Sequence, residues 1–178
     1  MKAGAAAAAR ALRSDLTSIR QARPGEGRQL SRLEADAASL FREIGRDAIA
    51  DAPPSSPQSY ERWIAAGGVL VADIEGALAA FLAHEPCDGH TFICEVSVHP
   101  AHMGKGIGRA LMDALPAPVS LSCFTDVPWN KPYYARLGFE AIDPATLGPG
   151  HSRIARDEAK RFHPWPRCVM FRAESQQG

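Results

Sequence analysis

The sequence has no net charge and no long apolar run. Its 20 lysines and arginines balance 20 aspartates and glutamates, so the chain has no overall field that would attract nucleic acid or an anionic membrane. No run approaches the roughly 18 apolar residues of a membrane-spanning helix, and the N-terminal stretch lacks the leucine-type core of a secretory signal. We therefore expect a soluble, cytoplasmic protein with neither nucleic acid nor a membrane as a partner.

Cysteine is scarce as well, and its spacing gives no disulfide framework. The chain has four cysteines, at Cys87, Cys94, Cys123 and Cys168. It is long enough to bury a core without cross-links. A metal site would have to draw on Cys87, His90, Cys94, His99 and His102. If residues 90–99 are extended, however, their ends lie roughly 30 Å apart and cannot share one ion. We expect reduced thiols and no metal.

The length of 178 residues fits one domain with a substantial core. Residues 1–17 are rich in alanine and contain a single acid, Asp15, which is typical of a frayed helix, a disordered tail or a transit-like segment. We expect residues 1–17 to be a flexible extension, residues 18–174 to form the domain, and residues 175–178 to be a tail.

Hydrophobic patterning predicts alternating strands and helices. Runs rich in β-branched, aromatic or alternating apolar residues predict strands at residues 19–24, 68–73, 77–83, 91–98, 119–125, 139–142 and 167–172. Apolar residues at helical spacing predict helices at residues 30–44, 60–66, 107–115, 130–137 and 152–162. A helix separates the strands at 91–98 and 119–125, so this pair should run parallel. The pattern indicates an α/β (α+β mixed) fold, with a mixed sheet flanked by helices.

A glycine-rich turn precedes the helix predicted at residues 107–115. Gly104, Gly106 and Gly108 lack the β-carbons that would keep a phosphate away from backbone amides, and they tolerate positive φ. The first amides of a helix are unpaired and attract anions. Lys105 and Arg109 add positive charge, so the turn is suited to a diphosphate.

Three phosphate-binding motifs compete for this turn. A P-loop requires Ser or Thr after its lysine, whereas Lys105 is followed by Gly106. A dinucleotide fingerprint requires a third glycine where Arg109 stands, although Asp126 lies near the distance expected for a ribose-binding acid. The P-loop is therefore excluded, and the dinucleotide fingerprint remains an alternative to the third motif.

The third motif is the best match and has a companion further along the chain. The stretch from Val98 through Met103-Gly-Lys-Gly-Ile-Gly108 resembles the acetyl-CoA-binding motif of the GNAT superfamily of N-acetyltransferases, with Met103 in place of the usual Gln or Arg. The stretch Asn130-Lys-Pro-Tyr-Tyr-Ala-Arg-Leu-Gly-Phe139 is similar to the later motif of the same family. The resemblance is strongest from residue 95 to residue 139.

This resemblance implies a GNAT-like fold and acetyl-CoA as co-substrate. The fold has a central mixed, mostly antiparallel sheet with a splayed parallel strand pair, flanked by helices. The backbone of the strand ending at Val98 would pair with the pantetheine arm, and one of its amides would polarise the thioester carbonyl. The cofactor-binding residues implied are Val96, Ser97, Val98, Met103, Gly104, Lys105, Gly106, Ile107, Gly108, Arg109, Asn130 and Tyr134.

Two residues are expected to act in catalysis. An amine must lose a proton before it attacks, and Glu95 lies on an otherwise apolar strand where partial burial would raise the pKa of its carboxyl. Glu95 facing solvent or pairing with an arginine is an equal alternative, and His84 and His99 are reserve bases. The resemblance assigns Tyr134, four residues before Gly138, to protonate the leaving thiolate.

Each of these side chains also has a structural interpretation. Tyr134 fits the core face of an amphipathic helix, and Asn130 fits a helix N-cap. Tyr133 lacks the register of Tyr134. In the family, the region around residues 47–66 tends to wall the acceptor site, so Tyr60 and Trp63 are expected acceptor contacts, with core packing as the alternative.

We predict an acyltransferase that moves an acetyl group from acetyl-CoA to a primary amine of a small molecule or protein by direct attack. The alternative is a catalytically silent acyl-CoA-binding module that senses the cofactor or serves a partner protein. A homodimer is left open, and the sequence does not identify the amine acceptor.

Overall fold

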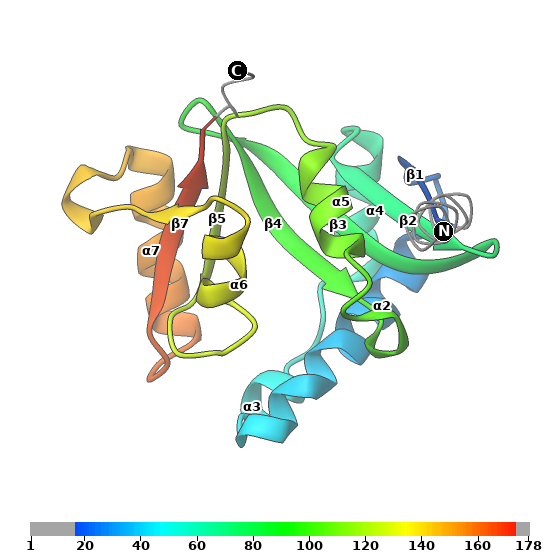
Figure 1. Ribbon diagram of the computed structural model, residues 1–178, viewed down its shortest axis with the longest axis horizontal. Coiled ribbons are helices and arrows are strands. Elements are labelled where there is room, and N and C mark those ends of the chain that lie inside the picture. The colour runs from blue at the N-terminus through cyan, green and yellow to red at the C-terminus, as the bar shows by residue number, and fades with distance from the viewer. Residues whose placement is uncertain (1–16, 174–178) are drawn as a thin grey trace, which may run out of the picture. The chain divides into compact units, whose positions relative to one another are not determined.

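The computed structural model describes residues 17–173, whose seven strands form one sheet in the order β1-β2-β3-β4-β5-β7-β6. The sheet is mostly antiparallel with one parallel pair, β4 and β5, and helices flank it (Figure 1). The mixed sheet expected from the sequence is confirmed. The expected extension lies outside the described residues except for Thr17, and the expected tail lies wholly outside them.

The predicted strands and helices appear in the expected order, and the short helix at Asp47–Ala50 is an addition to them. The strands are β1 (Thr17–Gln21), β2 (Val69–Ile74), β3 (Ala77–Cys87), β4 (His90–Val98), β5 (Val119–Phe124), β6 (Glu140–Ala141) and β7 (Arg167–Arg172). The α-helices are α2 (Gly27–Ala38), α3 (Asp47–Ala50), α4 (Pro57–Ala65), α5 (Ile107–Asp113), α6 (Lys131–Arg136) and α7 (Pro149–Arg161). Short 3-10 helices span Ser39–Ile44, Pro100–His102 and Pro144–Thr146. None of the helices within residues 17–173 is long and apolar enough to cross a membrane.

The end of β3 differs from prediction. The strand continues to Cys87 rather than ending at residue 83, because the turn into β4 is only two residues long. Asp88 and Gly89 have φ values of 48° and 80°, the backbone of a tight hairpin in which both central residues are left-handed. The longer connection implied by the strands predicted at residues 77–83 and 91–98 was therefore wrong.

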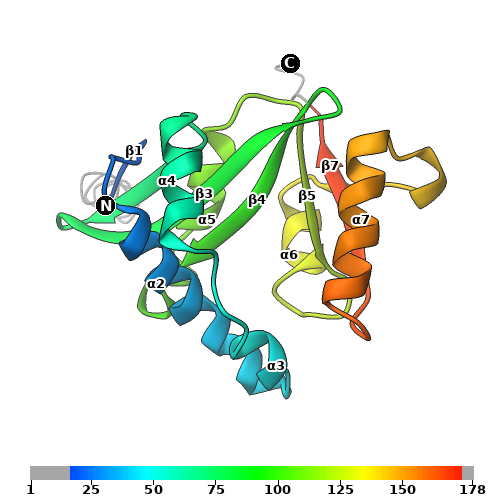
Figure 2. The same ribbon diagram turned by 180° about the vertical axis from the view of Figure 1, so that it is seen from behind.

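The described chain divides into two compact units, each with its own packing. The first consists of residues 17–83 and Glu95–Met112. In it, α2 and α4 pack together on one face of the sheet, seen in Figure 2, and α5 lies on the opposite face. The apolar faces of α2 and α4 pack against β2 and β3 in a core cluster of Leu30, Leu33, Tyr60, Ile64, Val69, Val71, Phe81 and Ala83. This burial explains the helical spacing in the sequence.

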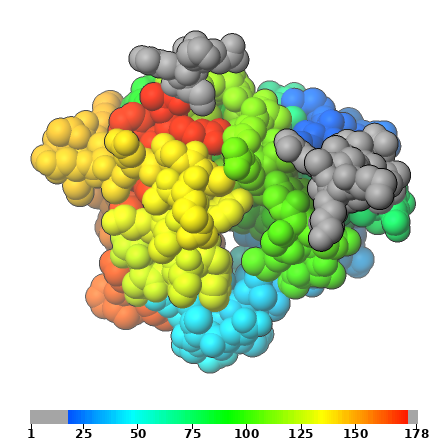
Figure 3. Space-filling view, in the orientation of Figure 1, coloured from blue at the N-terminus to red at the C-terminus, as the bar shows by residue number. Residues whose placement is uncertain are grey.

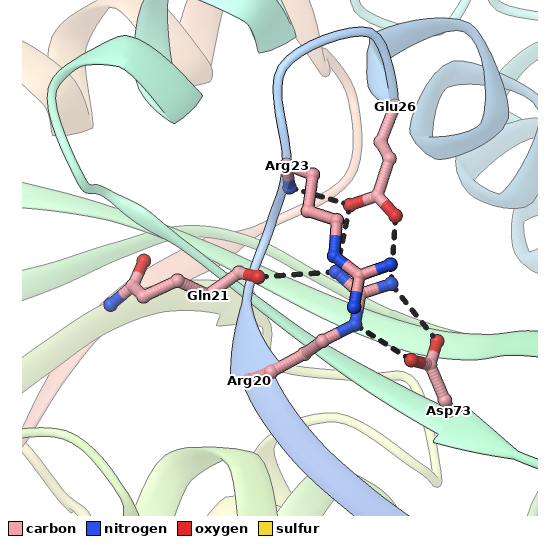
Figure 4. Close-up of polar contacts among 5 residues, drawn as sticks. All are labelled: Arg20, Gln21, Arg23, Glu26 and Asp73. Carbon is pink, nitrogen blue, oxygen red and sulfur yellow. Dashed lines mark hydrogen bonds and ion pairs between the residues drawn. The ribbon is translucent and has the colours of Figure 1, made fainter. Parts of the chain in front are cut away.

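Arg20 fixes the edge strand β1 within the first unit. Its Nε donates to Oδ2 of Asp73 on β2 at 2.7 Å, and its Nη2 donates to Oε1 of Glu26 at 2.7 Å (Figure 4). Glu26 also accepts a hydrogen bond from the amide of Arg23. The hydrogen bond from Arg20 is the main cause that lowers the pKa of Glu26. One guanidinium thus joins β1, β2 and the residue that precedes α2.

The second unit consists of His84–Cys94 and residues 113–173. In it, β5 pairs with β7 along all six residues of each strand, and α7 and α6 lie on opposite faces (Figures 1 and 2). Arg167 on β7 lies 4.4 Å from the ring centroid of Phe124 and 4.7 Å from that of Phe162. It also donates from Nε to Oε2 of Glu158 at 2.9 Å. These contacts anchor α7 to the sheet.

The parallel ladder between β4 and β5 is short. It pairs Thr91 with Val119, Phe92 with Ser120 and Ile93 with Leu121. Parallel pairing of these two strands was predicted from the helix that separates them, and it is confirmed. The residues of β4 from Cys94 onward lie beyond this ladder.

Candidate functional site

A hydrogen bond between two side chains marks the end of β4 in the first unit. Glu95 is half-buried, and Ser97 is only 4% exposed. The hydroxyl of Ser97 donates to Oε1 of Glu95 at 2.8 Å. A carboxylate held in this way has a fixed direction, as a general base requires. The partial burial expected for Glu95 is present, and the Ser97 side chain orients the carboxylate in addition to the backbone role expected for this residue.

A second carboxylate, Glu34 on α2, lies against Tyr60 on α4. Tyr60 has no exposed surface, and its hydroxyl donates to Oε2 of Glu34 at 2.6 Å. The same oxygen accepts from the amide of Ser55 at 2.8 Å. Burial raises the pKa of Tyr60 well above its usual value, and the charges of Glu34 and Glu95 raise it further. Tyr60 is therefore a neutral hydrogen-bond donor close to two acids.

Tyr60 and Trp63, the expected acceptor contacts, both pack against the core. Their ring centroids lie 5.5 Å apart, and the ring of Phe81 lies 5.2 Å from that of Tyr60. Tyr60 is fully buried, so its side chain presents no surface to an acceptor, and its hydroxyl instead contacts Glu34. Trp63 is half-buried, and its contact with an acceptor stays a prediction. Sequence reasoning missed Glu34, since its partner Tyr60 is 26 positions away and no local pattern links them.

The loop between β4 and α5 is anchored at its start and exposed beyond it. The amide of His99 donates to the carbonyl of Ala79 on β3 at 2.9 Å, and Nδ1 of His99 accepts from the amide of Ala101 at 3.2 Å. Met103 is 42% exposed. This loop and α5, drawn in green, lie on the surface shown in Figure 3. The backbone around residue 103 is thus accessible to a ligand.

Two of the three motif glycines have the backbone that only glycine adopts readily. Gly104 and Gly106 have φ values of 72° and 80°, and a β-carbon built on either meets no atom within 4 Å. The space above them is open. Gly108 differs from the expectation of positive φ, because it is buried inside the first turn of α5. Gly108 therefore lies on the buried side of α5.

Positive charge gathers beside these glycines. Lys105 and Arg109 are exposed, and Nζ of Lys105 lies 3.2 Å from Nδ1 of His102. Partial burial and then the charge of Lys105 lower the pKa of His102, so the imidazole is neutral at neutral pH and can accept from the lysine. The loop thus presents two cations and open backbone on one surface, a suitable arrangement for a diphosphate.

The second unit holds the other predicted site residues, on and before α6. Asn130 does not cap this helix with its side chain. Its Oδ1 instead accepts from the amide of Phe124, at the end of β5, at 3.4 Å. The N-cap interpretation of the side chain was therefore wrong. Asn130 instead ties the end of β5 to the start of α6.

Gly138 ends α6 as predicted, and the hydrogen bonds show why glycine is needed. The amide of Gly138 donates to the carbonyl of Ala135, and the amide of Phe139 donates to the carbonyl of Tyr134. This pair of bonds is a Schellman motif, which requires a left-handed residue. Gly138 has a φ of 86°. The ending fixes the last turn of the helix.

Tyr134 is half-buried in α6 and packs edge-on against two rings. Its centroid lies 5.9 Å from that of Phe139 and 5.4 Å from that of Tyr133. Tyr133 has the guanidinium of Arg136 at 6.0 Å from its ring. The structure thus gives the two tyrosines different surroundings. It brings Glu95 together with Ser97 in the first unit, and Asn130 together with Tyr134 in the second.

A further polar cluster in the second unit has a structural explanation. Ligand atoms of Cys87, Asp88 and His151 lie within 4.8 Å of one another, a grouping that differs from the set considered in the sequence. Both oxygens of Asp88, however, accept backbone amides at the start of α7, from Gly150 at 3.0 Å and His151 at 2.8 Å. These hydrogen bonds, led by the one from the amide of His151, lower the pKa of Asp88. Asp88 therefore caps α7.

The same histidine bridges Asp88 to a buried serine. Nδ1 of His151 lies 2.9 Å from Oδ2 of Asp88, and Nε2 lies 2.9 Å from Oγ of Ser120. The order of groups is that of a hydrolase triad. Ser120 has no exposed surface, so a substrate cannot reach its hydroxyl, and the bridge serves to hold β5 and α7 together.

Comparison with known proteins agrees with these motifs. Residues 65–141 match the family model of an acetyltransferase (GNAT) domain. The matched segment contains the end of β4, the glycine loop and α6. It therefore includes Glu95, the Gly104–Gly106 turn and Tyr134.

Solved structures share the fold over nearly the whole chain. N-acetylglutamate synthase from Neisseria gonorrhoeae, solved with coenzyme A and N-acetyl-glutamate, is 16% identical with a TM-score of 0.65, over 90% of this chain and 35% of the synthase. This chain thus spans about a third of the synthase.

Two further structures match over almost their full length. Ribosomal-protein-S18-alanine N-acetyltransferase from Escherichia coli is 16% identical with a TM-score of 0.61, covering 91% of this chain and 96% of that one. Rv2747 from Mycobacterium tuberculosis, solved with CoA and NLQ, is 17% identical with a TM-score of 0.64, covering 89% and 99%. At such identities the likeness establishes a common fold.

Proposed function

We propose that the chain is a member of the GNAT superfamily and transfers an acetyl group from acetyl-CoA to a primary amine of a small molecule or protein. The observation that carries this proposal is the match of residues 65–141 to the GNAT domain, a segment whose glycine loop is open and positively charged. The amine attacks the thioester directly, without an acetylated protein as intermediate.

Acetyl-CoA binding is assigned to the loop of residues 103–109 and to the end of β4. The open space above Gly104 and Gly106 admits a diphosphate to the backbone amides, and Lys105 and Arg109 offset its charge. Residues 96–98 lie beyond the β4–β5 ladder, so their backbone can pair with the pantetheine arm as an added strand does. Similar structures have been solved with coenzyme A, which supports this choice of co-substrate.

Glu95 is proposed as the base, with Ser97 as a positioning residue. Amines near pKa 10 are charged at neutral pH and must lose a proton before attack. The Ser97 hydroxyl fixes one oxygen of Glu95, and the carboxylate can accept the proton directly or through water. An amide of residues 96–98 would donate to the developing oxyanion.

Tyr134 is proposed to serve the departing thiolate, and Asn130 to hold the start of α6. Proton transfer from a tyrosine with a pKa near 10 to a thiolate whose thiol has a pKa near 8.5 is unfavourable by roughly 2 kcal/mol. Tyr134 can therefore stabilise the thiolate by a hydrogen bond as well as by full proton transfer. Both roles concern the coenzyme side of the reaction rather than the acceptor.

The acceptor that we propose is an amine, without a further substrate class. Related folds include enzymes named for an amino acid and for a protein alanine, and Trp63 is the half-buried aromatic that we assign to acceptor contact. We propose residues 18–174 as one catalytic domain that acts in the cytoplasm, alone or as a homodimer, and without nucleic acid or membrane as partner.

The test is turnover with a panel of amines, including amino acids, polyamines and peptides with free N-termini. We expect acetyl-CoA-dependent release of the coenzyme A thiol that requires one class of amine, together with the acetylated product by mass spectrometry. Tight acetyl-CoA binding without turnover of any amine would favour the alternative of a silent acyl-CoA-binding module.

A further inference from the structure

Two of the four cysteines lie directly opposite each other in the second unit. Cys123 on β5 and Cys168 on β7 are register partners in the antiparallel ladder. Directly opposite residues share one face of a sheet, and their β-carbons lie about 4.5–5.5 Å apart. A disulfide needs β-carbons about 3.5–4.5 Å apart, so a closure of about 1 Å between the strands suffices.

The two thiols already interact and differ in character. The Cys123 thiol is 2% exposed and donates to Sδ of Met170 at 3.5 Å. Cys168 is half-buried. Interaction with the Cys123 thiol, with help from the charges of Lys131 and Arg167, lowers the pKa of Cys168 against the effect of burial. The same interaction, together with burial, raises the pKa of Cys123. The pair therefore combines a half-buried thiol of lowered pKa with a buried thiol of raised pKa.

We propose that Cys123 and Cys168 are an oxidation site that forms a cross-strand disulfide when the protein meets a peroxide. The Cys168 thiolate attacks one peroxide oxygen and becomes a sulfenic acid, while the second oxygen leaves as hydroxide and takes a proton to give water. Cys123 then attacks the sulfenic sulfur, forms the S–S bond and releases a second water. Two thiols are oxidised, and one peroxide is reduced to two waters.

The site is selective because the described chain offers no second pair of this kind. Burial and then the negative charges of Asp88 and Glu85 raise the pKa of Cys87, which keeps that thiol protonated and slow to react. Cys94 lies on β4, a different strand from Cys123 and Cys168. Oxidation of this pair requires neither acetyl-CoA binding nor acetyl transfer.

The disulfide joins strands that lie beside α6. Phe124, the neighbour of Cys123, donates its amide to Asn130 at the start of this helix, and the charge of Lys131 acts on both thiols. A bond between β5 and β7 closes a long loop that contains α6 and α7, so it should restrict unfolding of this unit. We expect oxidation to raise the midpoint of thermal unfolding.

The experiment treats the intact chain with hydrogen peroxide, alkylates the remaining thiols in denaturant and maps the peptides by mass. We expect loss of two of the four thiols, one cross-linked species containing Cys123 and Cys168, and full recovery with a dithiol reductant. The Cys94→Ser variant is the control and should behave like wild type. In Cys123→Ala, Cys168 should remain as a sulfenic acid that a dimedone probe captures.

The result of the wild-type peptide map does not depend on whether the variants fold. Four intact thiols at a peroxide dose that oxidises free glutathione would overturn the proposal. A disulfide between other cysteines, or sulfenic acid at Cys168 of the wild type without a cross-link, would overturn it equally.

Discussion

The hydroxyl of Ser97 donates a hydrogen bond of 2.8 Å to Oε1 of Glu95, and from this contact a pH-dependent prediction follows. If Glu95 removes the proton of the amine, Glu95→Gln should lower kcat more at low pH than at high pH, because alkaline solvent can take the proton instead. Acetyl-CoA affinity should persist. The pH profile of kcat from thiol release is the measurement.

Ser97→Ala provides the matched comparison for this prediction. It keeps the carboxylate but removes its orientation, so we expect a loss of about tenfold in kcat, which corresponds to about 1.4 kcal/mol and is typical of one hydrogen bond to a charged group. A loss in Glu95→Gln that is uniform across pH would instead indicate a structural or acceptor-positioning role for Glu95.

Tyr134→Phe separates catalysis from packing on α6. The substitution keeps the ring against Phe139 and removes only the hydroxyl, so stability and acetyl-CoA affinity should change little. We expect kcat to fall by about 10²-fold, the usual scale for a positioned acid. Tyr133→Phe, one residue earlier in the same helix, is the control and should retain most activity. Equal, wild-type rates in both variants would show that Tyr134 is a packing residue.

Gly106→Val tests the diphosphate loop, and Gly76→Val is the control because this glycine has the same φ. Gly106 and Gly76 both have a φ of 80° and open space around a built β-carbon, but Gly76 lies in the β2–β3 hairpin. Valine should cost each variant a similar amount of stability, about 1–2 kcal/mol. Only Gly106→Val should lose acetyl-CoA affinity, by about tenfold or more in calorimetry. Unchanged affinity in a folded Gly106→Val protein would show that this loop does not bind the diphosphate of acetyl-CoA.

Arg20 should make the first unit sensitive to acid. Its hydrogen bond holds the pKa of Glu26 below the usual value, so this contribution to stability is present above about pH 4.3. It is lost as the pH falls through the lower, folded-state pKa. Arg20→Met should lower the free energy of unfolding by about 2 kcal/mol at pH 7 and by less near pH 3, as measured in urea. Arg23→Met, which spares the amide bonded to Glu26, should show a much smaller difference.

The features that the sequence could predict are those governed by local chemistry. Apolar spacing predicts α2 because Leu30 and Leu33 are buried one turn apart, and Gly138 predicts the end of α6 because a Schellman motif needs positive φ. The turn at Asp88 and Gly89 carried an equally local signal, since an Asp-Gly pair favours a two-residue hairpin, but the prediction placed it in a wider turn.

Tertiary contacts escaped prediction because they join residues far apart in the sequence. Asn130 fits an N-cap in isolation, yet its side chain accepts from Phe124 at the end of β5. The Glu34–Tyr60 bond and the Cys123–Cys168 pair depend on how α2 meets α4 and on the β5–β7 register. Composition and periodicity contain no information on such pairings before the fold is known.

Transfer of a labelled acetyl group tests the central claim most directly. The protein is incubated with deuterated acetyl-CoA, with and without the amine selected by the panel, and both protein and amine are weighed by mass spectrometry. Direct attack predicts label on the amine nitrogen in equal amount to the coenzyme A released, and no label on the protein when the amine is absent. Label that accumulates on a protein side chain and then passes to the amine, or an amine that stays unlabelled while acetyl-CoA binds, would contradict the account.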